Sequence, residues 1–65
     1  MQIMINGESR TLSTPQTVAA LLDSLGLSGR LAVEVNGQIV PRSRHSEYHL
    51  ALGDRVEIVR AIGGG

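Results

Sequence analysis

Two Asn-Gly dipeptides constrain the fold of this chain more than any other feature. Asn6-Gly7 and Asn36-Gly37 each follow a short stretch in which apolar and polar residues alternate. Asn-Gly favours the tight turn that joins two antiparallel strands, because both residues tolerate a positive φ. We therefore expect one β-hairpin over residues 2–12 and a second over residues 31–40.

One helix is predicted between the hairpins, roughly over residues 17–25. Four apolar residues recur at the spacing of a single helix face: Val18, Leu21, Leu22 and Leu25. Thr17 is a suitable N-cap, and Thr14 followed by Pro15 is a competing start. Gly26 suits the position just after the last helical turn.

The remaining segments predict one further strand and a short one at an edge. Residues 42–47 are polar and are expected to be irregular. Residues 48–52 are expected to form a short edge strand, and residues 55–59 are expected to form the last strand. The order of elements predicts an α+β fold with one helix across one face of a mixed sheet of four to five strands. The first and last strands should lie centrally. We divide the chain into a domain of residues 1–60 and a flexible tail of residues 61–65.

Composition excludes several classes of function. The 65 residues carry six basic and six acidic side chains, one tyrosine as the only aromatic residue, and no cysteine. A neutral chain with one aromatic residue lacks the basic field and the stacking platform of a nucleic-acid binder. No apolar run approaches the ~20 residues of a membrane span, and residues 1–6 lack a signal-peptide pattern. We expect a cytoplasmic protein that is a monomer when free.

Candidate metal and catalytic residues are few. His45 and His49 are four residues apart, but their segment has no helix pattern and no further ligand, so we expect solvated loop histidines and no metal site. Asp54 and Glu57 could pair as carboxylates, although Asp54 stands in a Gly-Asp turn, where aspartate is common for backbone reasons. No catalytic residue is expected.

The chain ends in Ile62-Gly63-Gly64-Gly65. Glycine loses more conformational entropy on ordering than any other residue, so a run of glycines adds little to the stability of a fold and suggests a function for the tail. Without side chains it could enter a narrow cleft of another protein and present the bare carboxylate of Gly65. A frayed terminus is the alternative reading. Extended, the residues after the last strand would reach roughly 20 Å.

A docking surface is expected beside the tail. Met4 and Val59 should both point outward, and they would be neighbours if the first and last strands pair. Ile62 follows along the tail, so an apolar group would lie next to the reactive end. Scattered apolar residues mean little, whereas a contiguous group would indicate a surface for a partner.

Several segments together resemble the ThiS family of ubiquitin-like β-grasp sulfur carriers. The resemblance runs over the whole chain, and its most specific parts are Asn36-Gly37-Gln38-Ile39-Val40-Pro41-Arg42 and the terminal Gly64-Gly65. It implies a carrier that is not itself an enzyme and binds no cofactor. Gly65 would be the covalent site, and Gly64, Gly63 and Ile62 would be recognised by the partner.

The resemblance also implies partners. A ThiF-like adenylating enzyme would activate the Gly65 carboxylate with ATP and magnesium. A sulfur donor, such as a cysteine desulfurase, would then convert it to a thiocarboxylate. Thiazole synthase would take that sulfur into the thiazole ring of thiamine.

Three alternatives stay open on the sequence. The same chemistry could serve molybdopterin or another sulfur-containing product. The chain could be a ubiquitin-like modifier that forms isopeptide bonds with target proteins. It could also be a plain interaction module with an inert tail.

Overall fold

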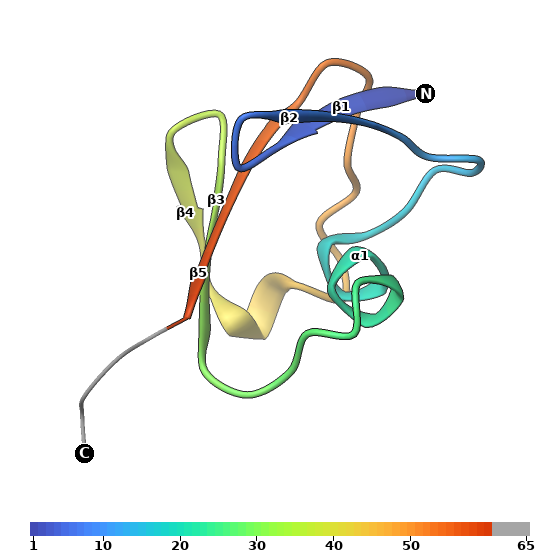
Figure 1. The fold of residues 1–65 in the computed structure, drawn as a ribbon. Helices are drawn as coiled ribbons and strands as arrows, with labels where there is room; N and C mark the ends of the chain where they lie inside the picture. Colours follow the sequence, from blue (N-terminus) through green and yellow to red (C-terminus); the bar gives the residue numbers. More distant parts are fainter. Residues whose placement is uncertain (61–65) are drawn as a thin grey trace.

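A five-stranded mixed sheet with one α-helix across one face forms the fold in the computed structural model, which describes residues 1–60 (Figure 1). Strand order across the sheet is β2-β1-β5-β3-β4, so β5 is central, as predicted. The elements are β1 (Gln2–Ile5), β2 (Glu8–Thr11), α1 (Val18–Ser24), β3 (Leu31–Val35), β4 (Gln38–Val40), the 3₁₀ helix η1 (Arg42–Arg44) and β5 (Arg55–Arg60). The predicted α+β class is confirmed.

Both predicted hairpins form at the Asn-Gly dipeptides. Asn6 and Asn36 have φ values of 49° and 53°, and the glycines that follow them have φ values of 82° and 85°. These are the paired positive φ angles that a type I′ turn requires. Strands β1 and β5, far apart in the sequence, pair in parallel, whereas β3 and β5 pair antiparallel.

Helix α1 begins at the predicted cap. The hydroxyl of Thr17 accepts a hydrogen bond from the Ala20 amide, 3.1 Å away, which satisfies one of the unpaired donors of the first turn. Gly26 has a φ of 71° just beyond the helix, as expected for a residue that ends it. The competing start at Thr14 is therefore wrong.

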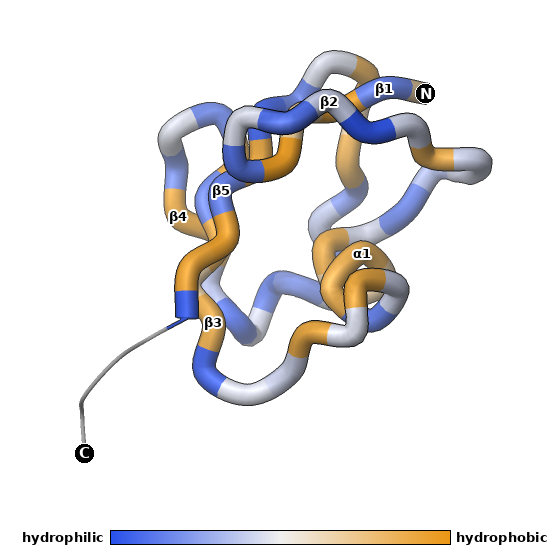
Figure 2. Tube along the Cα trace, in the orientation of Figure 1, coloured by the Kyte–Doolittle hydropathy of each residue, from blue (hydrophilic) through white to orange (hydrophobic). Residues whose placement is uncertain are grey.

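The core lies between α1 and one face of the sheet. In Figure 2 apolar residues, in orange, concentrate along α1 and along parts of the central strands. Alternation sends every second strand residue to the helix side. The largest fully buried side chains are Ile3, Val18, Leu21, Val33, Val35 and Val56.

Two local predictions between β4 and β5 are wrong. Residues 42–47 include the helix η1 and are not wholly irregular. Residues 48–52 form no edge strand, because their backbone pairs with the loop before α1 instead: Tyr48 accepts from Val18, and Leu50 donates to Gln16, both at 2.9 Å. The single bridge there joins Thr17 to His49. Leu50 is buried in the core, so its side chain fixes this segment against the rest of the domain.

Within residues 1–60, no helix has the length and apolar character needed to cross a bilayer.

Candidate functional site

The C-terminal end of β5 is the scaffold for the predicted reactive tail. Ile62, Gly63, Gly64 and Gly65 lie outside the described residues, so the geometry that bears on them is that of β5. The two neighbouring strands support β5 unequally: β3 accompanies it as far as Arg60, whereas β1 pairs with it only at Arg55 and Val56. The side of β5 that faces β1 therefore needs another partner near its end.

Two asparagine side chains supply partners for β5. Asn6 accepts a hydrogen bond from the Ile58 amide at 2.7 Å and donates to the Ile58 carbonyl at 3.1 Å. At the start of the strand, Asn36 accepts from the Arg55 amide at 2.9 Å and donates to Asp54 at 3.0 Å. Each Asn-Gly turn thus reverses the chain within its own hairpin and also anchors the central strand through the asparagine side chain.

Sequence reasoning missed this anchoring, because asparagine was interpreted only as a turn residue. The available signal was that both turns use Asn at their first position, where other residues also serve. Asn has a side-chain amide that can donate and accept at once, which makes it a substitute for a strand residue.

The predicted docking pair of Met4 and Val59 is on one face, but its members are not neighbours. Both side chains point away from α1 and are exposed, to 36% and 60%. The parallel register places Met4 beside Arg55, and Val59 lies four residues further along β5, beside Ala32. At a strand rise of ~3.3 Å per residue, they are separated by about 13 Å along the sheet. The expected direct contact is wrong, because pairing alone does not fix register.

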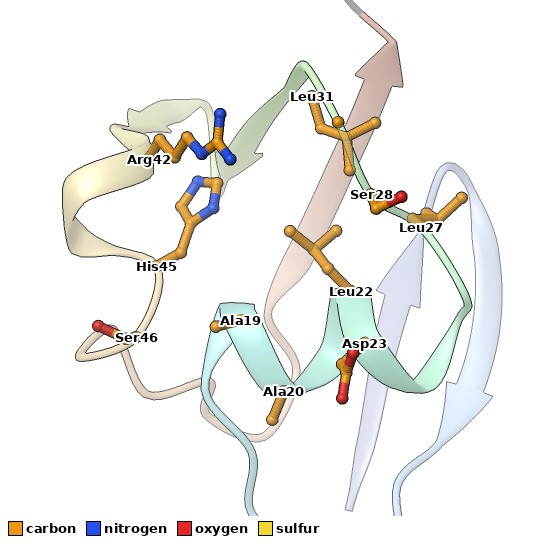
Figure 3. A pocket seen from close by; sticks show the side chains of 11 residues that line it. Ala19, Ala20, Leu22, Asp23, Leu27, Ser28, Leu31, Arg42, His45 and Ser46 are labelled. Atoms are coloured by element: carbon orange, nitrogen blue, oxygen red, sulfur yellow. The ribbon is translucent and has the colours of Figure 1, made fainter.

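A hollow of about 540 Å³ lies on the helix side of the sheet, between α1, the loop after it and η1. In Figure 3, Arg42 and His45 extend from one wall, and Leu22, Leu27 and Leu31 lie on the other side. Leu31 is paired with Arg60 at the end of β5, so this hollow is near the base of the tail. Alanine and leucine side chains line it together with polar side chains, which include Asp23, Arg42 and His45.

His45 was predicted to be a solvated loop residue, and this prediction is wrong because the side chain is part of the structural core. Its side chain is buried, and its Nε2 lies 3.0 Å from the carbonyl oxygen of Val40. Its own carbonyl accepts from the Ala19 amide at 2.9 Å. His45 therefore joins β4 to α1. His49 is exposed, as predicted.

The other candidate polar residues have structural roles. Within the described range, no group of three His, Cys, Asp or Glu side chains could hold a metal ion. Asp54 accepts from the Ala51 amide at 2.8 Å and from Asn36, which closes the turn before β5. Arg44 pairs with Glu47 at 2.6 Å on the surface. Nothing in residues 1–60 brings Asp54 and Glu57 together as a carboxylate pair.

Comparison with known families gives one match over nearly the whole chain. The sequence profile of the ThiS family matches residues 3–65. The sulfur carrier protein ThiS of Escherichia coli is 33% identical over 66 aligned positions, which cover all of both chains. The crystal structure of the thiamine biosynthesis protein ThiS from Geobacter metallireducens superposes with a TM-score of 0.88, at 29% identity and with both chains fully covered.

A second kind of relative is much longer. A thiazole synthase from Paramagnetospirillum magneticum is 48% identical to this chain over 66 aligned positions. The chain is covered completely but spans only 20% of that protein. The similarity is therefore to one ThiS-like segment of a larger polypeptide.

Proposed function

The chain belongs to the ThiS family of sulfur carrier proteins, and we propose that it carries sulfur for thiazole formation in thiamine biosynthesis on its C-terminal residue, Gly65. One observation carries the proposal. The family match continues to residue 65 and so includes the two final glycines. The alignment with the Escherichia coli sulfur carrier protein likewise covers both chains from end to end.

The chemistry that we propose begins at the Gly65 carboxylate. A carboxylate is a poor electrophile, so a partner enzyme must activate it, and we assign ATP and magnesium to that enzyme. Attack of the carboxylate oxygen on the α-phosphorus of ATP releases pyrophosphate and forms an acyl-adenylate. The terminal sulfur of a persulfide on the donor then attacks the carbonyl carbon and displaces AMP, which gives an acyl persulfide. A thiol reductant cleaves its S–S bond, which releases the thiocarboxylate and leaves the donor sulfur in a disulfide. We place this ATP-dependent chemistry in the cytoplasm.

The role of this chain in that reaction is to present its tail as a co-substrate. β5 is held by β3 along its length and by Asn6 near its end, which gives the tail a fixed base. Gly63 and Gly64 have no side chains, so the backbone could pass through a narrow cleft of the partner. Met4 and Val59, at two points of one sheet face, are proposed docking residues for that partner.

Thiazole synthase is the proposed acceptor of the sulfur. Two relatives are named thiazole synthase, and each contains a segment that is similar to the whole of this chain. Fusion of two functions in one polypeptide favours an association between the separate proteins. A ThiF-like adenylating enzyme and a cysteine-dependent sulfur donor complete the set of proposed partners.

Intact-mass measurement tests the proposal. The purified chain is incubated with its adenylating enzyme, ATP, Mg²⁺, cysteine, a cysteine desulfurase and a thiol reductant. We expect the mass to rise by the exchange of one oxygen atom for sulfur, with the change located at Gly65. An unchanged mass under conditions in which the enzyme consumes ATP would refute the carrier function.

Gly64→Val tests the requirement for a bare tail. The branched side chain should block passage through the partner's cleft and abolish the mass increase, with the fold unchanged by circular dichroism. Ala61→Val is the matched control, because it adds a branched side chain outside the glycine run. Equal yields from wild type and Gly64→Val would contradict this part of the proposal.

A further inference from the structure

The side chain of Arg42 has no binding partner within residues 1–60. Arg42 is the last residue of the segment 36–42, the most specific internal part of the resemblance to the ThiS family. The turn and β4 account for residues 36–40, and Pro41 stands at the N-cap of η1. The Arg42 side chain is exposed and makes no hydrogen bond or ion pair in the described part of the chain. Its planar guanidinium is therefore available to bind a carboxylate of another molecule.

Arg42 lies at the hollow on the helix side of the sheet. In Figure 3 it extends from the η1 side, and Leu22 and Leu27 lie across from it. Leu27 and Leu31 are only partly buried, so the hollow exposes some of their apolar surface. The volume of about 540 Å³ is within the range of binding pockets. Leucine walls beside an arginine suit an apolar side chain that stands next to a carboxylate.

A second arginine adds positive charge at the same end of the domain. Arg60, the last residue of β5, points to the same side of the sheet as Ile58, and its Nη1 donates to the carbonyl of Ser28 at 3.5 Å. Ser28 also lines the hollow. No carboxylate pairs with Arg42 or Arg60 within residues 1–60. The two positive charges favour an acidic occupant.

Asp23 specifies how such an occupant lies in the hollow. It comes from α1 and is on the other side of the hollow from Arg42 (Figure 3). A carboxylate is repelled near Asp23 and attracted near Arg42. The acidic group of the occupant is therefore favoured at the η1 side only.

The hollow is next to the base of the tail, on the opposite side of the sheet from the proposed docking residues Met4 and Val59. Leu31, in its lining, pairs with Arg60. Residues 61–65, when extended, span about 17 Å. A protein seated in the hollow therefore leaves Met4 and Val59 free for the adenylating enzyme and lies within reach of the activated end.

We propose that this hollow docks the persulfide-bearing sulfur donor, through an acidic segment of the donor that carries an apolar side chain. The carboxylate of that segment pairs with Arg42, and its apolar side chain packs against Leu27 and Leu31. The identity of the donor rests on the proposed function above. The adenylating enzyme and the donor then bind opposite sides of the sheet, so the sulfur reaches the acyl-adenylate before the tail leaves the enzyme.

Arg42→Gln tests the proposal by separating the two steps. Carrier-dependent exchange of pyrophosphate with ATP measures adenylation alone and should proceed at the wild-type rate. Intact mass at a series of cysteine desulfurase concentrations measures thiocarboxylate formation. The half-saturating desulfurase concentration should rise about fivefold or more, the scale expected when an interface arginine is lost. The urea midpoint should not change, because the side chain has no partner within the described domain.

Arg10→Gln is the matched control for the loss of one positive charge. Arg10 is exposed on β2, at the opposite edge of the sheet from β4. It should leave pyrophosphate exchange and the half-saturating desulfurase concentration unchanged.

Two variants at Ser46 test the sign of the charge. Ser46 is exposed and lines the hollow, so Ser46→Glu and Ser46→Lys add long side chains of opposite charge at one place. Ser46→Glu should raise the half-saturating desulfurase concentration, whereas Ser46→Lys should lower it or leave it at the wild-type value.

The docking proposal is overturned if Arg42→Gln leaves the half-saturating concentration unchanged, or if Arg10→Gln raises it equally. Loss of pyrophosphate exchange in Arg42→Gln would overturn it too, because Arg42 would then serve the adenylating enzyme. Equal effects of the two Ser46 variants would contradict an acidic occupant. In each case normal thiocarboxylate formation by wild type would leave the carrier function standing. Absence of thiocarboxylate from wild type itself would instead refute that function.

Discussion

The side chain of Asn6 occupies the place of a strand residue opposite Ile58. Its amide oxygen accepts from the Ile58 amide at 2.7 Å, and its amide nitrogen donates to the Ile58 carbonyl at 3.1 Å. The two residues are 52 positions apart in the sequence. β1 pairs with β5 only as far as Val56, so this contact extends the support of β5 by two residues toward the tail.

Replacement of Asn6 by glycine should loosen the end of β5. Glycine keeps the positive φ of the turn but removes both hydrogen bonds to partly buried groups, and we expect a loss of about 1–3 kcal/mol in the free energy of unfolding. Asn6→Ala should cost about 1–2 kcal/mol more, because alanine is strained at positive φ. Urea denaturation measures the loss, and faster hydrogen exchange of the Ile58 amide would locate it.

Asn36→Gly is the control for that prediction. Asn36 has almost the same φ and also bonds to backbone and side chain at the start of β5, but its bonds are exposed to water. The expected loss is about 0.5–1.5 kcal/mol, smaller than at Asn6. An equal or larger loss at Asn36 would contradict the special role of the contact with Ile58.

The N-cap of α1 gives a second prediction. Thr17→Ala removes the acceptor for the Ala20 amide and should lower the free energy of unfolding by about 1 kcal/mol. Thr14→Ala changes an exposed residue that precedes the helix and should have an effect within about 0.5 kcal/mol. Urea midpoints of the two variants decide which threonine begins the helix. A larger effect at Thr14 would place the start of α1 earlier than the structure has it.

Local rules explain why so much of the fold could be predicted. Each hairpin is specified by a dipeptide and its flanking alternation, and α1 by a stripe of apolar residues between Thr17 and Gly26. These signals act over a few residues, and the structure confirms them. The central position of β5 followed from the need to bury Val56 and Ile58 against the helix.

Relations between distant strands could not be predicted in the same way. The separation of Met4 from Val59 and the opposition of Glu34 and Glu57 both depend on register, and alternation alone specifies only the face of each residue. A shift by two residues would keep every side chain on its side of the sheet and change all of its neighbours.

The burial of His45 was missed for a different reason. Its neighbours Arg44 and Ser46 are exposed, and a single buried residue in a polar segment leaves no period in the sequence. η1 turns this one side chain inward, where it meets the carbonyl of Val40.

His45 gives the third prediction, which separates hydrogen bonding from packing. His45→Phe fills the site but removes the contact between the ring nitrogen and the buried carbonyl of Val40, so we expect a loss of about 0.5–1.5 kcal/mol in the free energy of unfolding. His45→Ala also leaves a cavity and should cost more. A domain of this size has only about 3–5 kcal/mol of stability, so the alanine variant should be partly unfolded at room temperature.

His49→Ala provides the comparison, because His49 is exposed and four residues away. It should change the free energy of unfolding by no more than about 0.5 kcal/mol. Circular dichroism during urea titration measures all three variants under the same conditions. If His45→Phe were as stable as wild type, packing alone would account for the burial of this residue. The hydrogen bond to Val40 would then have no part in joining β4 to the helix.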